Sequence, residues 1–339
     1  MTAPIAVRMD VPDYAGLLAR TDAPAGSSWG IFGRDDELGT LNFITPERVR
    51  HAASLIRRGD RFNLDKALDA FTPPLASHRR NPVHRIVSNS TDHRDDYVDG
   101  LYLQGSSQID SLRHFRHGDY GFYNGHPDSD IVAGKPTLGI NRYAEHGIVG
   151  RGVLLDLERY LARQGRALDH RAGEPFRAAL LDEVADAQGV AFHSGDIVMV
   201  RTGWMAHYFN VLTDAERASL PANLCSPGLL QEQASVRWLW DRQVSVIASD
   251  NVGIEAFPLP ERSPLLSRRD MACGCFSGHA AMMHPTIIGL LGLCLGELWD
   301  LEALARDCAA TGIYECMVSC KPLNLTGGVG SPANAMAIV

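Results

Sequence analysis

Three short runs of β-branched and apolar residues constrain the fold most strongly. They cover residues 152–156, 196–201 and 244–248, and each has the length and composition of a buried strand. Between them lie stretches at 175–188 and 230–241, in which apolar residues recur at the spacing of a helix. Strands that alternate with helices predict an α/β domain built on a buried sheet.

The length of the chain bounds its domain organisation. The chain has 339 residues, of which 45% are hydrophobic, enough to bury the core of one large domain or two smaller ones. Because no repeat, low-complexity tract or flexible linker divides it, we predict a single compact domain over residues 29–339. Residues 1–28 are rich in Ala, Pro, Asp and Gly, and we predict that they form an N-terminal arm.

The charge and hydropathy of the chain argue against several partners. The formal net charge is −8 and no basic run stands out, so neither nucleic acid nor an anionic membrane is expected as the main partner. The longest apolar stretch, 287–295, is much shorter than the ~20 residues of a membrane span. The first ten residues lack the pattern of a secretion signal. We therefore expect a cytoplasmic protein that acts on a small molecule.

The seven cysteines do not form a zinc-binding pattern. The closest two, Cys273 and Cys275, are separated by one residue rather than by the two residues of a zinc knuckle. We expect reduced, mostly buried thiols, as is usual in the cytoplasm. A cysteine-nucleophile hydrolase that pairs one of these two thiols with His279 is an alternative, because four residues separate Cys275 from His279.

The most informative segment covers residues 101–114. If the chain is extended ahead of Asp110, Gln104, Gln108 and Asp110 share one polar face, because side chains alternate between the faces of a strand. His114 follows four residues later, near enough to meet Asp110 if the chain turns. Amide and carboxylate oxygens suit Mn or Mg, and an imidazole extends the choice to Zn or Fe. A polar face turned toward water is the alternative that spacing alone leaves open.

Several short motifs are spread over most of the chain. In chain order they lie at residues 29–30, 36–39, 104–114, 194–204, 227–229, 249–253, 284–297 and 330–334. In the order of these motifs the chain resembles the cyclase-type metal-dependent hydrolases, a family that includes bacterial kynurenine formamidase and isatin hydrolase. The signature of that family reads His-x-Gly-Thr-His-x-Asp-x-Pro-x-His. Its functional positions fall here on Gln104, Gln108, Asp110 and His114, so two imidazoles are replaced by amides.

The resemblance implies both a fold and an activity. The fold is expected to be a compact α/β arrangement of the swivelling β/β/α type. The activity is expected to be hydrolysis of a small amide, lactam or lactone by a water that a divalent ion activates. Family members are usually oligomers, so we expect a homodimer or homotetramer, with the arm at 1–28 available to reach across an interface.

The resemblance also implies which residues hold the metal and which move protons. His284 precedes Pro285 at an expected helix start, and Glu297 follows a short expected strand, as in the metal site of the family. His114 is expected to act as general base and then as general acid. Amide oxygens in place of imidazoles favour Mn²⁺ over Zn²⁺. The implied metal ligands are Asp110, His284, Gln108, Gln104 and Glu297.

Three further residues are candidates for substrate contact. Asp250 follows the strand expected at 244–248, a position that often faces a ligand in α/β folds, although an Asp-Asn pair also forms turns. Arg113 and Tyr123 lie close to the polar segment in sequence, and packing is the alternative role of Tyr123. Two other functions stay open at this point. One is a metal-free binding protein on the same fold, and the other is a cyclase or dehydratase that uses the same metal and histidine.

Overall fold

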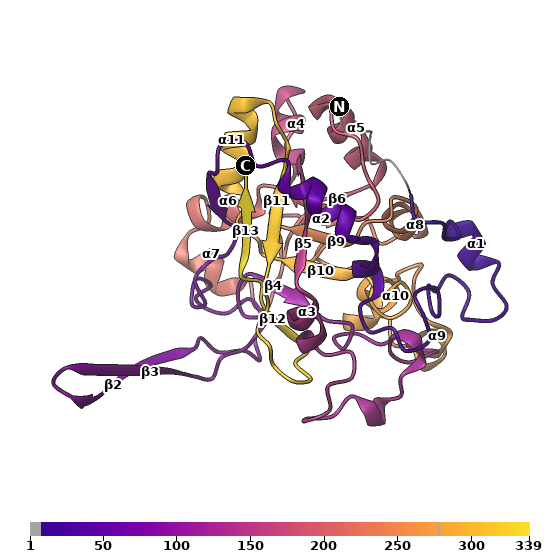
Figure 1. The fold of residues 1–339 in the computed structure, drawn as a ribbon, viewed down its shortest axis with the longest axis horizontal. Coiled ribbons are helices and arrows are strands. Elements are labelled where there is room, and N and C mark those ends of the chain that lie inside the picture. The colour runs from indigo at the N-terminus through magenta and orange to yellow at the C-terminus, as the bar shows by residue number, and fades with distance from the viewer. Residues whose placement is uncertain (1–7, 277) are drawn as a thin grey trace.

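One curled nine-stranded sheet organises the computed structural model, which describes residues 8–276 and 278–339 (Figure 1). The strands follow one another in the order β1-β13-β11-β5-β7-β9-β10-β4-β12. Their bounds are β1 (Arg61–Asn63), β4 (Gln108–Asp110), β5 (Ile148–Asp156), β7 (Ile197–Arg201), β9 (Val246–Ser249), β10 (Cys294–Glu297), β11 (Glu315–Cys320), β12 (Gly330–Pro332) and β13 (Ala335–Ile338).

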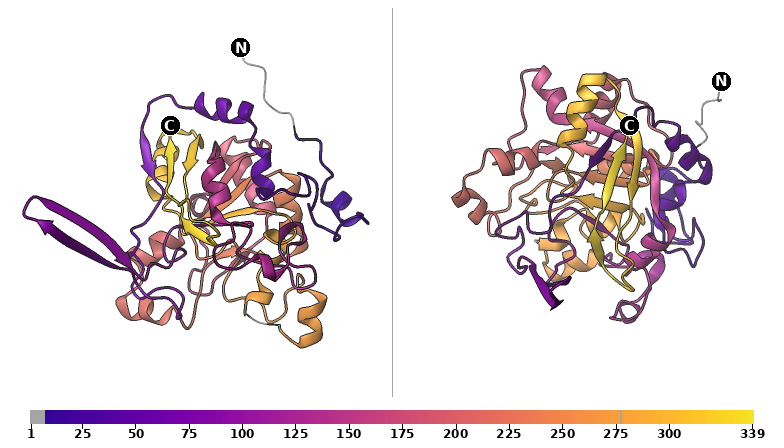
Figure 2. Two further views of the ribbon diagram at one scale, coloured as in Figure 1. Left: turned by 60° about the horizontal axis from the view of Figure 1, so that its bottom comes forward. Right: turned by 60° about the vertical axis from the view of Figure 1, so that its left-hand side comes forward.

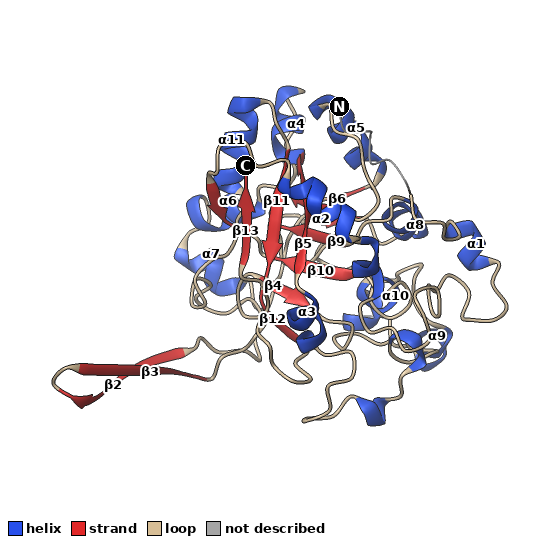
Figure 3. Ribbon diagram, viewed as in Figure 1, coloured by secondary structure: helices blue, strands red, loops and turns tan. Residues whose placement is uncertain are grey.

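Helices surround this sheet (Figure 3). Their bounds are α1 (Tyr14–Leu18), α2 (Pro46–Ala53), α3 (Ile140–His146), α4 (Leu157–Arg163), α5 (Ala179–Gln188), α6 (Trp204–Asn210), α7 (Asp214–Ser219), α8 (Gln233–Asp241), α9 (Arg268–Cys273), α10 (His284–Ile287) and α11 (Glu302–Thr311). Two small sheets pair β6 (Pro175–Phe176) with β8 (Gly228–Leu229) and β2 (Val83–Ser90) with β3 (His93–Asp99). Within the described part of the chain, no helix has the length and apolar character needed to cross a bilayer.

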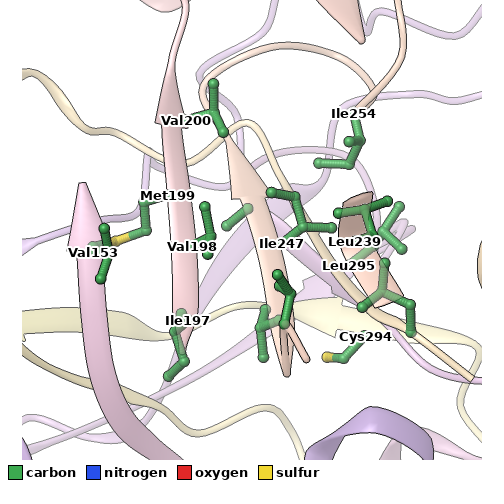
Figure 4. Packing of buried hydrophobic residues seen from close by; sticks show 14 of the residues in the cluster. Val153, Ile197, Val198, Met199, Val200, Leu239, Ile247, Ile254, Cys294 and Leu295 are labelled. Atoms are coloured by element: carbon green, nitrogen blue, oxygen red, sulfur yellow. The ribbon is translucent and has the colours of Figure 1, made fainter. Parts of the chain in front are cut away.

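The centre of the large sheet is parallel and buried on both faces. β5, β7, β9 and β10 pair in parallel, with Val153 opposite Val198 and Val198 opposite Ile247. Every residue of β7 and β9 is buried, as expected where both faces of a sheet are covered. Figure 4 shows these side chains packed between neighbouring strands of the core. The three expected strands correspond to β5, β7 and β9, and the prediction of an α/β fold with a buried sheet is confirmed.

The polar segment ahead of Asp110 departs from its prediction. Only Gln108–Asp110 is extended, as β4, whereas residues 103–107 form turns and bends. The hydroxyl of Ser106 donates to the carbonyl of Ala67, and the hydroxyl of Ser107 donates to the carbonyl of Leu298. Such side-chain bonds to the backbone compete with a strand ladder, and here they accompany a compact turn.

The cysteines also depart in part from their prediction. Cys273 and Cys275 are not reduced thiols but form a disulfide at the end of α9, where both are exposed. Gly274 between them has a φ of 74°, a left-handed conformation that glycine adopts readily and that turns the chain back on itself. A cysteine-nucleophile hydrolase at this pair is therefore contradicted, because neither sulfur is free. Of the other five thiols, four are buried as expected.

Residues 8–28 of the expected arm pack on α8 of the same chain. The backbone N–H of Tyr14 donates to Asp241 Oδ1 over 2.7 Å, and the indole of Trp240 donates to the carbonyl of Pro12 over 2.8 Å. Tyr14 and Leu17 are buried. Residues 1–7 lie outside the described residues, so the division of the chain at residue 28 and the reach of the arm across an interface stay predictions.

The β2–β3 hairpin projects away from the rest of the chain (Figures 1 and 2). Every residue of both strands is exposed, and Ile86 is 68% exposed. Polar side-chain pairs join the strands. The Nε2 of His84 lies 2.7 Å from Asp96 Oδ2, and the Nε of Arg85 donates to Asp99 Oδ2 over 2.9 Å.

Candidate metal centre

A cavity of about 130 Å³ opens beside β4 and β10. An engineered cavity of about 150 Å³ is large enough for benzene, so this cavity suits a substrate of one ring or a short chain. Polar groups of β4, β10 and α10 line it together with apolar side chains from loops. The lining residues are Leu75, Ala76, Arg79, Gln104, Gly105, Gln108, His114, Phe115, Leu224, Val252, His279, Met282, His284, Glu297 and Leu298.

The pairing of β4 with β10 gathers three oxygen-bearing side chains. The antiparallel register places Gln108 directly opposite Glu297, and Asp110 lies two residues after Gln108. Opposite and alternate residues point to the same face, while Ile109 between them is buried in the core. The Nε2 of Gln108 donates to Glu297 Oε2. The three residues of β4 thus place the side chains of Gln108 and Asp110 on the same face as the carboxylate of Glu297 in β10.

His284, the first residue of α10, lies against these carboxylates. Its Nε2 is 3.0 Å from Glu297 Oε1, and its Nδ1 is 2.9 Å from Glu255 Oε1. The side chain of His284 is only 1% exposed. Burial by itself lowers the pKa of His284, but Glu255 and Glu297 together hold that pKa well above its ordinary value. Negative charge therefore dominates the environment of this imidazole.

The residues present fit a divalent cation. Asp110, His284 and Glu297 offer ligand atoms that all lie within 4.8 Å of one another. Two buried oxygens beside them, Gln108 Oε1 and Asp110 Oδ2, have no hydrogen-bond partner within the described chain. Buried oxygens without donors are costly, and a bound cation satisfies them. Two carboxylates, an amide oxygen and one imidazole form a predominantly oxygen set.

The pKa of Glu297 reflects its burial beside a second carboxylate. Burial raises this pKa to about 7, His284 opposes the rise, and Asp110 adds to it. Two carboxylates that share a buried site repel each other, and a cation between them removes the repulsion. The repulsion between Asp110 and Glu297 and the short distances within the donor set thus both favour a bound cation.

His114 and Gln104 lie at the edge of the candidate metal set. The Nε2 of His114 is 3.8 Å from Asp110 Oδ2 and 3.2 Å from the Nε2 of Gln104. Gln104 donates to Asp110 Oδ1 over 2.5 Å from the turn ahead of β4. Burial lowers the pKa of His114 to about 4, although Asp110 opposes this. A neutral imidazole at neutral pH is able to accept a proton.

The structure brings Asp110, His114, Gln104, Gln108, His284 and Glu297 together at this cavity. Arg113, Tyr123 and Asp250, which were expected to contact substrate, do not line this cavity. Arg113 donates to the carbonyls of Lys135, Gly327 and Val132.

Tyr123 and Asp250 are likewise committed elsewhere. The hydroxyl of Tyr123 donates to Asp36 Oδ2 over 3.0 Å, away from the cavity lining. Asp250 accepts hydrogen bonds from Thr202 and from the backbone of Gly203. Both residues are fully buried. Neither side chain lines the cavity, and contact of either one with a substrate stays a prediction.

Glu255 is the functional candidate that the sequence analysis missed. Its Oε1 accepts from the backbone N–H of Met283 over 2.8 Å and lies against the Nδ1 of His284. Burial raises the pKa of Glu255, but His284 more than offsets this and leaves the pKa below its ordinary value. A carboxylate on the second ring nitrogen fixes the orientation of a metal-binding histidine. The available signal was a charged residue between apolar Ile254 and Ala256, two positions after the 249–253 motif.

Comparison with known proteins agrees with this architecture. The family model described as "Putative cyclase" matches residues 69–256. The crystal structure of a novel cyclase has 32% sequence identity and a TM-score of 0.78, over 92% of this chain and 99% of that one. Isatin hydrolase A from Labrenzia aggregata, bound to benzyl benzoate, has 17% identity and a TM-score of 0.54, over 85% and 95% of the two chains.

A second isatin hydrolase A, from Ralstonia solanacearum, has 15% identity and a TM-score of 0.52, over 85% and 93% of the two chains. At such identities the two isatin hydrolases share the fold. No curated protein matches the chain. The family match over more than half of the chain, together with the 32% identity to a solved cyclase, shows that this chain belongs to the cyclase family.

Proposed function

We propose that this chain is a metal-dependent hydrolase that opens a small amide, lactam or lactone. The observation that carries the proposal is the convergence of Asp110, His284 and Glu297, where Asp110 Oδ2 and the neighbouring Gln108 Oε1 are buried without a hydrogen-bond donor. A divalent ion bound there lowers the pKa of water and polarises a carbonyl group. The isatin hydrolases that share the fold support hydrolysis of a cyclic amide as the reaction class.

The protein side chains divide the remaining work. Asp110, Glu297, His284 and Gln108 would hold the cation, and Glu255 fixes the orientation of the His284 ring through its Nδ1. In this proposal His114 takes a proton from water as the nucleophile attacks, and returns it to the leaving nitrogen or oxygen. Its low pKa keeps the imidazole neutral and ready to accept that proton.

Gln104 has a positioning role in this mechanism. Its Nε2 donates to Asp110 Oδ1 and contacts His114, so it joins the metal-binding side to the proton-transfer side. The predominantly oxygen donor set supports Mn²⁺ over Zn²⁺ as the resident ion. A cyclase or dehydratase that uses the same residues is a second candidate, since the family model is described as a putative cyclase.

A substrate panel tests the reaction class. Formylated amines, cyclic imides and lactones are offered to the purified protein with added Mn²⁺, with added Zn²⁺ and after chelation. We expect hydrolysis of at least one class, lost on chelation and restored better by Mn²⁺. Turnover that is unchanged after complete removal of the metal would contradict the mechanism, and tight ligand binding without turnover would favour a binding protein.

We also infer a homo-oligomer of two or four copies, with the β2–β3 hairpin as its contact. An isolated two-stranded hairpin is marginally stable in water, yet this one exposes Ile86, Tyr97 and Val98. A second copy of the chain that covers these side chains supplies the missing burial. Sedimentation is expected to show an oligomer that Ile86→Asp dissociates, and a monomeric wild-type protein would contradict the inference. The cytoplasm as the location of the chain stays a prediction.

A further inference from the structure

The cavity above the candidate metal centre carries a permanent positive charge in its wall. Arg79 is the one arginine or lysine among the described residues that line it. Its Nη1 donates to the carbonyl of Gln104. Within the described ranges, no carboxylate lies within 4 Å of the Arg79 guanidinium, whereas Arg201 is paired with Asp156, Glu158 and Glu302. Most of the Arg79 donors are therefore available to a ligand.

The rest of the cavity has a polar side at the candidate metal centre and an apolar wall. Glu297 lines the polar side together with His114 and His284, and Asp110 completes the candidate ligand set there. The apolar wall consists of Leu75, Phe115, Leu224, Val252, Met282 and Leu298. A ligand that matches these features has a carbonyl group for the metal centre, an apolar body and an anionic group for Arg79.

We propose that Arg79 binds a carboxylate of the substrate. The proposal rests on the hydrolase function proposed above and narrows it to small amides, lactams or lactones that carry a carboxylate on an apolar body. The guanidinium matches a carboxylate because its planar donors pair with both oxygens at once. Arg79 and His114 line the same cavity, so a substrate whose carboxylate binds Arg79 can present its scissile carbonyl to His114.

Arg79 also supports the turn that carries Gln104, and that bracing role must be separated from anion binding. Arg79→Gln retains an N–H donor for the carbonyl but removes the charge, whereas Arg79→Lys retains the charge. Arg80 is exposed and is absent from the described lining of the cavity, so Arg80→Gln is a matched control for loss of one positive charge.

Calorimetric titration of the metal-loaded full chain with benzoate and with benzyl alcohol provides the test. The two probes share a ring and differ in charge, and neither requires turnover. We expect Arg79→Gln to weaken benzoate binding by about tenfold or more, in line with loss of a charge-assisted hydrogen bond, and to leave benzyl alcohol within about twofold. Arg79→Lys is expected to keep most of the benzoate affinity, and Arg80→Gln all of it.

Three results would overturn the proposal. They are unchanged benzoate binding in Arg79→Gln, an equal loss for both probes, and a wild-type protein that does not bind benzoate. The outcome is independent of the substrate panel, because binding is measured without hydrolysis. A failure of the hydrolase assignment is thereby distinguished from a failure of the anion site.

Discussion

The buried centre and the exposed hairpin contain the same chemical pair in two environments. The Nδ1 of His284 lies 2.9 Å from Glu255 Oε1, and the Nε2 of His84 lies 2.7 Å from Asp96 Oδ2. The first two side chains are 1% and 0% exposed, and the other two are 55% and 65% exposed. Water screens the hairpin pair, whereas the buried pair interacts strongly. Burial, rather than separation, distinguishes a candidate site from a surface contact.

Removing the imidazole from each pair gives the largest expected difference. His284→Ala removes the imidazole that lies between the buried carboxylates of Glu255 and Glu297, and we expect it to lower the free energy of unfolding by about 3–5 kcal/mol. His84→Ala removes an exposed contact and is expected to change little. Urea unfolding of the two variants measures this contrast. Equal and small losses in both would show that burial does not strengthen the pair at His284.

The proton-transfer role of His114 predicts a loss of rate without a loss of metal. We expect His114→Ala to reduce kcat by about 10²–10⁴-fold on any substrate that the panel identifies. Metal content is expected to stay at the wild-type level, because His114 lies outside the set of Asp110, His284 and Glu297. His93→Ala in the hairpin is the control and is expected to keep full rate. A variant that loses metal as well as rate would move His114 into the ligand set.

The orienting role of Glu255 predicts a smaller effect on metal affinity. Glu255→Gln keeps the size of the side chain but removes the charge that fixes His284 Nδ1. We expect the affinity for Mn²⁺ to fall by about 10–100-fold. Asp96→Asn makes the same change of charge beside His84 and is expected to leave Mn²⁺ affinity unchanged. A competition titration against a metal indicator measures both affinities. An Mn²⁺ affinity of Glu255→Gln equal to that of the wild type would refute the orienting role of Glu255.

The pH dependence of stability gives the smallest expected contrast. The pKa of His114 falls to about 4 in the folded chain, below the ordinary value of 6.5 that applies when unfolded. As pH falls from 6.5 toward 4, the unfolded state therefore takes up the proton first, and stability is lost over that window. We expect His114→Gln to reduce this loss relative to the wild-type chain. Urea midpoints measured between pH 7 and pH 4 provide the readout.

The sequence was most informative where the regular alternation of side chains along a strand determined their direction. Gln108 and Asp110 were expected on one face, and the two-residue alternation of β4 produces that arrangement. His284 and Glu297 were expected from a helix start and a strand end, and α10 and β10 occupy those positions. Gln104 reaches Asp110 through a turn instead of a strand, so proximity in sequence was sufficient although the backbone prediction was wrong.

Long-range contacts explain what local patterns did not reveal. Glu255 meets His284 across 29 residues, and no period links the two positions. Arg113 and Tyr123 lie close to the polar segment in sequence, but backbone carbonyls and Asp36 hold them away from the cavity. Arg79 is separated from Gln104 by a hairpin that projects from the body, so its place in the cavity wall depends on the tertiary fold.

Metal content tests the central claim most directly. Elemental analysis is performed on the purified wild-type protein and on Asp110→Ala, His284→Ala and the hairpin control Asp96→Ala, each after incubation with Mn²⁺ and removal of free ion. We expect bound divalent metal in the wild type and in Asp96→Ala, and little in the two variants of the buried centre. A wild-type protein that holds no metal, or an Asp110→Ala variant that holds as much as the wild type, would contradict the account.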